Sequence, residues 1–236
     1  MSDKRRFSQQ FGGAEMLASM AAGFQHETPE STVDMVVARS LEVVEDADSA
    51  SVTLRVGGRL QTVAATDDLS RRADELQYEA GEGPCMTAAL DDEWYRTGDI
   101  GTDLRWPRWG AQAAELGLGS LLSVPLLSRG EPTGALNLYA TRTGCFNDRD
   151  DVHFATLYAT HVALALSSSR LAAELRTAAQ SRHVIGMAQG ILMERFTLTP
   201  EQSFALLRRY SNNLNVKLHE VAEHVLASGQ LPDAGT

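Results

Sequence analysis

The 236-residue sequence lacks long apolar segments and contains almost no cysteine. No stretch approaches the ~18 consecutive apolar residues of a membrane-spanning helix. The charged segment Met1–Phe11 has no apolar centre of the kind that secretory signal peptides carry. Cys85 and Cys145 lie far apart without a partner motif, which favours a reducing compartment over a disulfide framework or a structural zinc site. We therefore expect a cytoplasmic protein without a membrane segment, in which each cysteine packs as a small apolar side chain.

The sequence also lacks the motifs of common active sites. It contains no P-loop, no dinucleotide-binding glycine fingerprint and no nucleophile elbow. His219 and His224 are five residues apart without a metal-binding pattern. His153 and His161 could in principle ligate haem, although histidines at a surface or in a core are far more common. We therefore expect no enzymatic activity, no cofactor and no metal.

Negative charge is in excess, and it is unevenly distributed. The formal net charge is -10. Residues 1–177 contain 16 Lys and Arg against 26 Asp and Glu, whereas residues 178–236 contain five of each sign. An acidic surface repels a polyanion, so any nucleic acid is expected to bind near the end of the chain.

Hydrophobic residues make up 43% of the chain, enough for a packed core. Gly57-Gly58 is a strong hairpin signal between two β-like runs. The periodicity predicts strands at 50–56, 59–65, 118–127 and 133–141, and helices at 14–24, 32–44, 66–79, 86–90 and 106–116. The front of the chain is therefore predicted to be α+β.

A long helix is predicted from Asn147 to about Phe196. Two interpretations of it remain open: a coiled-coil seam of a homodimer, or a helix packed on its own domain with a break near Thr177–Ser181. Residues at a strict spacing of seven favour the seam, namely Leu157, Leu164, Leu171, Ala178, Ile185 and Leu192. A coiled coil needs a second apolar position in each repeat, and the residues there fit it poorly, namely Thr160, Ser167, Glu174, Ser181 and Ala188.

Two short helices are predicted after the long one. Thr199-Pro200-Glu201 is a helix start, with a capping hydroxyl, proline in the first turn and an acid at the positive end. That helix is expected to run to about Ser211, with a turn at 212–215. A last helix is expected from Lys217 to Ala227.

Three segments near the end of the chain resemble the ANTAR family in sequence and spacing. They are Arg182–Arg195 (RHVIGMAQGILMER), Leu198–Arg209 (LTPEQSFALLRR) and Asn215–Ala222 (NVKLHEVA). The resemblance implies a three-helix unit that binds paired RNA hairpins and prevents transcription termination. Gln189 stands where the family usually has a lysine, so this chain has an amide there in place of a cation.

Residues 32–167 resemble a GAF domain, on the segments Gly81–Cys85 (GEGPC), Gly119–Leu126 (GSLLSVPL) and Gly134–Tyr139 (GALNLY). The resemblance implies an antiparallel sheet with flanking helices, and a sensor for a small-molecule or protein signal. We expect an N-terminal arm and helix at 1–31, the GAF-like sensor at 32–167, and a linker helix with the ANTAR RNA-binding domain at 168–232.

An RNA-binding surface needs cations for phosphates and polar or aromatic groups for bases. The candidates are the cations Arg195, Arg208, Arg209 and Lys217, the base-reading or stacking residues Tyr210, Gln189, Ser211 and Asn215, and the small residues Ala188 and Gly190, which let RNA approach closely. The alternative is a solvated helix face with ordinary surface charges, in which Arg209 pairs with Glu220 or Glu223.

A second candidate site lies in the front of the chain. Trp94, Trp106 and Trp109 cluster in sequence, and we expect Cys85, Trp94, Trp106, Ser123 and Tyr139 to line a ligand pocket. A cap of tryptophans over the core is the alternative. Three functions follow for the whole chain: an RNA-binding antiterminator controlled by a sensor, a DNA-binding transcription factor with a sensor, and a sensor that acts only through protein contacts.

Overall fold

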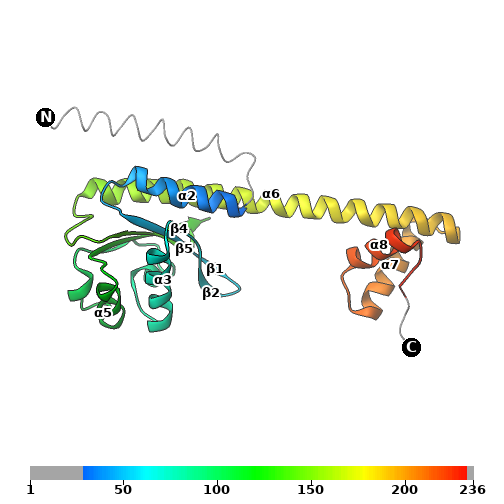
Figure 1. The fold of residues 1–236 in the computed structure, drawn as a ribbon. Helices are drawn as coiled ribbons and strands as arrows, with labels where there is room; N and C mark the ends of the chain where they lie inside the picture. The colour runs from blue at the N-terminus through cyan, green and yellow to red at the C-terminus, as the bar shows by residue number, and fades with distance from the viewer. Residues whose placement is uncertain (1–28, 233–236) are drawn as a thin grey trace, which may run out of the picture. The chain divides into compact units, whose positions relative to one another are not determined.

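A computed structural model describes residues 29–232, with the side chains of 29–32 left aside, and the helix expected at 14–24 lies outside this range (Figure 1). The chain forms two compact units, with the boundary after Arg170. None of the described helices is long and apolar enough to cross a membrane.

The first unit is built on a five-stranded antiparallel sheet. In chain order the strands are β1 (Ser49–Val56), β2 (Arg59–Ala65), β3 (Tyr95–Thr97), β4 (Ser120–Ser128) and β5 (Glu131–Ala140), and they lie in the order β2-β1-β5-β4-β3. Gly57 and Gly58, with φ of 58° and 82°, close the predicted β1–β2 hairpin. The sequence did not predict β3, because three residues are too few to show an alternating pattern.

One face of this sheet is covered by α2 (Pro29–Val43) and by the first turns of α6 (Arg149–Phe196), which run side by side (Figure 1). Val36, Val52 and Leu122 come from α2, β1 and β4, and all three are buried in the same apolar cluster. Tyr158 on α6 joins the two helices, because its hydroxyl donates to the carbonyl oxygen of Val36 at 2.6 Å. This face therefore packs as an apolar layer.

The other face is covered by α3 (Asp68–Ala80), α4 (Pro84–Ala88), the short helix η2 (Ile100–Thr102) and α5 (Pro107–Glu115). Asp67 caps α3, since its carboxylate accepts from the Ser70 amide at 2.8 Å. Trp109 is fully buried between α3 and the sheet. The two helical layers and the sheet between them give the expected α+β architecture.

The loop Gly81–Gly83 connects α3 to α4, and Glu82 in this loop also contacts the start of α5. Gly81 ends α3 in the left-handed conformation with φ of 67°. The Glu82 carboxylate accepts from the amides of Arg108 and Trp109, at 2.6 and 3.2 Å, and so caps the start of α5. Partial burial raises the pKa of Glu82, but these hydrogen bonds outweigh it and hold the pKa below its usual value.

The second unit consists of the end of α6 with α7 (Pro200–Leu214) and α8 (Leu218–Ser228). Thr199 forms a capping box with Gln202, which confirms the predicted helix start. Helix α7 extends to Leu214, so the predicted end at Ser211 was wrong. Asparagine tolerates the left-handed conformation, and only Asn215, with φ of 52°, ends the helix.

Helix α6 is one continuous helix of 48 residues, so the break near 177–181 that the second interpretation included is not formed. Leu164 and Leu171 are 65% and 54% exposed on it, as a seam requires, but Leu192 is fully buried in the core of the second unit. A straight helix drifts ~20° for every seven residues relative to a strict heptad. The residues at a spacing of seven therefore do not stay on one exposed face of the helix, and Leu192 faces the core of the second unit.

Replacing Gly83 with alanine should destabilise the first unit more than replacing Gly117 does. Both residues have positive φ, 145° and 87°. A Cβ at Gly83 would also lie 2.2 Å from Oε1 of Gln77, whereas a Cβ at Gly117 meets nothing within 4 Å. We expect the loss in the free energy of unfolding to be larger for Gly83→Ala by at least about 1 kcal/mol. Urea unfolding of the two variants measures the difference, and equal losses would contradict this packing.

Candidate functional site

A buried carboxylate lies at the centre of the first unit. Asp74 on α3 is fully buried. Its Oδ1 accepts from the Tyr139 hydroxyl and from Nδ2 of Asn137, at 2.5 and 3.1 Å, and its Oδ2 accepts from the Thr62 hydroxyl at 2.8 Å. These donors belong to β5 and β2, so the carboxylate joins α3 to two strands of the sheet.

The hydrogen bonds continue from this carboxylate to α4 and β4. Gln77 donates through Nε2 to the Tyr139 hydroxyl at 3.2 Å and accepts at Oε1 from the Cys85 amide at 2.8 Å. Asn137 accepts at Oδ1 from the Ser123 hydroxyl at 2.7 Å. The structure therefore brings together three of the predicted sensor residues, Cys85, Ser123 and Tyr139. All three are fully buried and already bonded to protein partners.

Burial raises the pKa of two groups in this interior, the Asp74 carboxyl and the Cys85 thiol. Loss of solvation raises the pKa of Asp74 to about 6, against hydrogen bonds from its neighbours that lower it. Burial, with the nearby Asp74 charge, raises the pKa of the Cys85 thiol. Cys85 is therefore a protonated packing residue rather than a reactive thiolate.

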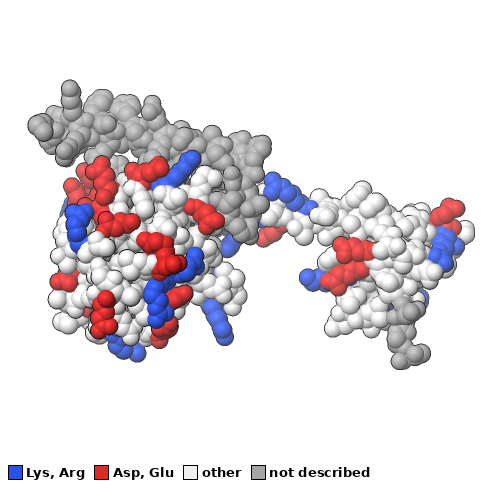
Figure 2. Space-filling view, in the orientation of Figure 1, with Lys and Arg blue, Asp and Glu red and all other residues white. Residues whose placement is uncertain are grey.

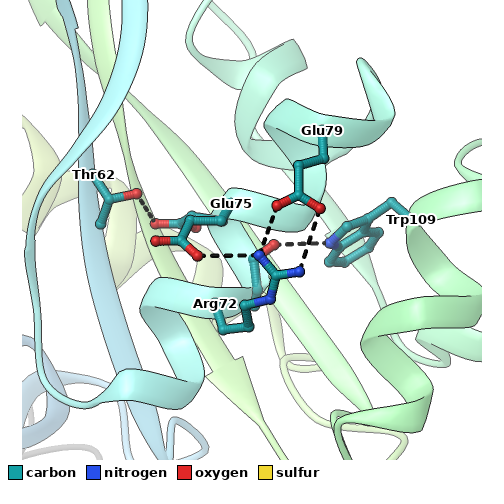
Figure 3. A network of polar contacts seen from close by, with 7 residues as sticks. Thr62, Arg72, Glu75, Glu79 and Trp109 are labelled. Atoms are coloured by element: carbon teal, nitrogen blue, oxygen red, sulfur yellow. Dashed lines mark hydrogen bonds and ion pairs between the residues drawn. The ribbon is translucent and has the colours of Figure 1, made fainter.

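The predicted tryptophan cluster is only partly formed. Trp109 donates through Nε1 to the carbonyl oxygen of Ala73 at 3.1 Å (Figure 3), and Trp106 is 6% exposed with its ring edge-on to Tyr95. These two tryptophans cap the core. Trp94 is 46% exposed and does not belong to this cluster, so its prediction as a lining residue beside Cys85 was wrong.

The outer side of α3 carries an ion-pair cluster that Figure 3 shows from close by. Arg72 reaches Glu75 and Glu79, with nitrogen–oxygen distances of 3.2 and 2.7 Å. All three side chains are largely exposed to solvent, so this cluster contributes little to stability. The buried contacts on the inner side hold the helix in place.

The raised pKa of Asp74 should make stability depend on pH. The folded-state pKa is about 6, against ~3.9 in an unfolded chain. Between these two pKa values the folded protein retains a proton on Asp74 that the unfolded chain has lost. The contribution of Asp74 to the free energy of unfolding is therefore fully present below about pH 4 and is lost as the pH rises through about 6. Across this pH range the free energy of unfolding should fall by ~3 kcal/mol because of Asp74, and we expect Asp74→Asn to remove this fall.

Urea unfolding at several pH values between these limits tests the prediction. Asp92→Asn is the matched control, because it makes the same replacement at an exposed position outside the buried network. That variant should keep the slope of the unaltered protein. If the free energy of unfolding of Asp74→Asn depends on pH as it does in the unaltered protein, Asp74 is ionised in the folded protein over this pH range and the prediction is wrong.

The second unit carries the candidate nucleic-acid interface. Arg208 and Arg209 are exposed on α7, and Lys217 is exposed at the start of α8. None of these three cations forms an ion pair with a described carboxylate, so the alternative pairing of Arg209 with Glu220 or Glu223 is not formed. The Arg209 guanidinium lies 6.0 Å from the centre of the Tyr210 ring.

Other candidates hold the unit together. Gln189 donates through Nε2 to the carbonyl oxygen of Pro200 at 2.9 Å and to the Ser203 hydroxyl at 3.3 Å, so its amide ties α6 to the start of α7. Arg195 donates to the carbonyl oxygen of Gly229. Ala188 is fully buried in the core of this unit. Its predicted contact with RNA was therefore wrong, because no surface of its side chain is accessible.

The turn between α7 and α8 uses two further candidates. The Ser211 hydroxyl donates to the carbonyl oxygen of Val216 at 2.6 Å, and Asn215 is the left-handed residue that ends α7. Both residues shape the turn that carries Lys217. Gly190 lies on the exposed side of α6, where an added Cβ would meet nothing within 4 Å.

The sequence analysis did not single out Phe204 as a candidate for RNA contact. The structure buries Leu207 completely and leaves Phe204 40% exposed. Phe204 and Arg208 are four residues apart and therefore share one face of the helix. A large aromatic residue one turn before an exposed arginine was the signal that could have found this pair.

The charges of the two units differ, as the sequence predicts. Figure 2 shows acidic side chains gathered over the first unit, while the second unit carries few charges of either sign. The exposed cations of α7 and the α7–α8 turn are therefore not surrounded by a large acidic excess. A phosphate chain is expected to bind there more readily than on the first unit.

The sheet between two helical layers, with a long helix leading to a small helical unit, defines a sensor-type α+β domain followed by a helical output module. Comparison with family models identifies both parts: the GAF domain model matches residues 26–167 and the ANTAR domain model matches residues 173–226. The chain belongs to the GAF domain family and carries an ANTAR domain. Both are domains of signal transduction and transcription regulation rather than catalytic domains.

Solved structures share the fold of the first unit. The GAF domain of a sensor histidine kinase from Pseudomonas syringae pv. tomato has a TM-score of 0.54 at 18% identity, covering 75% of this chain and 99% of that one. A domain of a two-component sensor histidine kinase from Sinorhizobium meliloti 1021 has a TM-score of 0.53 at 18% identity, covering 64% and 99%. Free methionine-R-sulfoxide reductase from Neisseria meningitidis has a TM-score of 0.54 at 19% identity, covering 68% and 91%. A search among curated proteins found no match.

Proposed function

We propose that this protein is a cytoplasmic, homodimeric regulator of transcription antitermination, in which the GAF domain senses a signal and the ANTAR domain binds paired RNA hairpins. The observation that carries the proposal is the exposed group of Phe204, Arg208, Arg209 and Lys217 on the ANTAR domain. Guanidinium and ammonium groups contact phosphates, and an exposed aromatic ring stacks on an unpaired loop base. A hairpin loop presents both kinds of partner at once.

A DNA-binding transcription factor is the second candidate, because two helices joined by a short turn resemble a helix-turn-helix. In that motif the second helix enters the major groove and must carry side chains that read base edges. Helix α8 contains no Lys or Arg, and its exposed side includes Glu220 and Glu223. Because these carboxylates would face the phosphates of a duplex, the RNA function is favoured.

Thiol chemistry of the kind that reductases use is not supported by the cysteines. Cys85 and Cys145 are both buried, and burial raises the pKa of each thiol. A reactive cysteine needs an accessible thiolate with a lowered pKa. The likeness to the Neisseria enzyme therefore extends to the fold and supports no reductase activity here.

The double variant Arg208→Ala/Arg209→Ala should bind a tandem-hairpin RNA more weakly. We expect Kd at moderate salt to rise by about tenfold or more, and the slope of log K against log salt to fall by about one for each arginine. Titration of labelled RNA at several salt concentrations measures both quantities. A duplex DNA of equal length, titrated alongside, distinguishes the two candidate functions.

The matched control is Arg59→Ala/Arg129→Ala, which removes the same charge from exposed positions of the GAF domain. It should leave Kd and the salt slope unchanged. Loss of affinity in both double variants would mean that net charge alone matters. Unchanged affinity in Arg208→Ala/Arg209→Ala, with an intact fold by circular dichroism, would remove these residues from the interface. Preference for duplex DNA would favour the second candidate.

The proposed homodimer rests on the exposed leucines of α6. Leu164, Leu171 and Leu175 are 65%, 54% and 60% exposed on this one helix. Leu175 supplies an apolar companion four residues after Leu171, which the spacing of seven did not include. A second copy that packs on these leucines would remove apolar surface from water, which is the usual driving force of such a seam.

Leu171→Glu should convert the dimer to a monomer, because a carboxylate would have to be desolvated in the seam. Sedimentation equilibrium over a range of concentrations measures the change. Leu104→Glu is the matched control, since Leu104 is 90% exposed and lies in the GAF domain far along the chain from α6. The seam is refuted if Leu171→Glu dimerises as strongly as Leu104→Glu.

A further inference from the structure

A groove with a volume of about 630 Å³ lies at the β3 edge of the GAF sheet. Its lining residues are Trp94, Arg96, Asn147, Arg149, Val152, His153 and Thr156. It opens on the side of the sheet that α6 covers, whereas the polar interior around Asp74 lies on the side that α3 covers. The volume is within the ~300–1,000 Å³ of small-molecule sites.

The local geometry directs the side chains of two elements into this groove. Arg96 pairs with Leu122 in the β3–β4 register, and Leu122 faces the α2–α6 layer. Trp94 lies one residue before β3 and lines the same groove. Across the groove, Arg149, His153 and Thr156 recur at helical spacing on one face of α6. Val152 lies between them as a buried apolar floor.

The groove is basic within an acidic domain. No Asp or Glu is among its described lining residues. Asp150 and Asp151, in the first turn of α6, are not among the lining residues, and the charges nearest Asp151 include Asp46 and Glu45, which follow α2. Arg96 is positioned by a hydrogen bond from Nη1 to the carbonyl oxygen of Phe146 at 2.7 Å. Neither Arg96 nor Arg149 forms an ion pair with a carboxylate in the part of the chain that the structure describes.

We propose that this groove binds a small organic anion that carries a planar aromatic ring. The anionic group is held by the guanidinium groups of Arg96 and Arg149, which form charge-assisted hydrogen bonds. The ring packs on the half-exposed indole of Trp94 and on Val152. The buried residues around Asp74 offer no comparable site, because their donors and acceptors are bonded to one another. The inference concerns the input side of the protein and does not depend on RNA binding.

Indole-3-acetate is the probe, because it combines a carboxylate with a planar ring. Calorimetric titration into the full-length protein should show binding at one site per chain. Acetate lacks the ring and indole lacks the charge, so each should bind at least about tenfold more weakly.

Two variants test whether the probe binds in this groove. Arg149→Gln should weaken binding by about tenfold, because one charged contact is lost. Trp94→Leu should also weaken binding in the calorimetric titration, because the ring of the probe loses its aromatic partner. Arg129→Gln, an exposed arginine in the β4–β5 turn outside the groove, is the matched control and should bind as the unaltered protein does.

The proposal fails if indole-3-acetate does not bind at millimolar concentration, or if indole binds as well as indole-3-acetate does. It also fails if Arg149→Gln and Arg129→Gln have the same affinity as the unaltered protein. Circular dichroism checks that each variant is folded. Arg149 is exposed and makes no ion pair with a described carboxylate, so its replacement should leave the fold intact and the test decisive.

Discussion

The carboxylate of Asp74 is the interaction on which the architecture of the GAF domain depends. A buried carboxylate is costly to desolvate unless several donors satisfy it. Here Thr62, Asn137 and Tyr139 supply those donors from β2 and β5. Because α3 carries the acceptor and two strands carry the donors, any shift of the helix along the sheet would break these bonds. A ligand that entered this interior would have to replace them.

The ANTAR domain is stabilised differently. Its core is apolar, and the polar side chains of Gln189 and Ser211 act near the ends of its helices, where each donates to a backbone carbonyl oxygen. Gln189 supports the start of α7, and Ser211 supports the turn before α8. Two of the polar residues that sequence reasoning assigned to RNA thus shape the surface. The exposed cations Arg208, Arg209 and Lys217 have no described carboxylate partner, which supports the proposed contact with phosphates.

Local signals predicted most of the fold. Gly57-Gly58, Asp67 and Thr199 each act within a few residues of themselves, so the hairpin and the two helix starts could be recognised in the sequence. The positions of Asp74 and Leu192 depend on contacts between distant segments. Asp74 resembles an ordinary surface acid on an amphipathic helix until the donors from β2 and β5 are known. The sequence indicated which unit carries the candidate RNA site. The structure was needed to show that Phe204 and Arg208 are exposed on it whereas Ala188 is buried.

The short edge strand β3 has a consequence for how copies of this protein can associate. An open sheet presents unpaired backbone groups at both edges, and a long flat edge can recruit further strands without limit. Here one edge is only three residues long, and both edge strands carry an arginine, Arg59 on β2 and Arg96 on β3. Short length and charge disfavour strand addition. The sheet is therefore protected against open-ended polymerisation, even though it is not closed into a barrel.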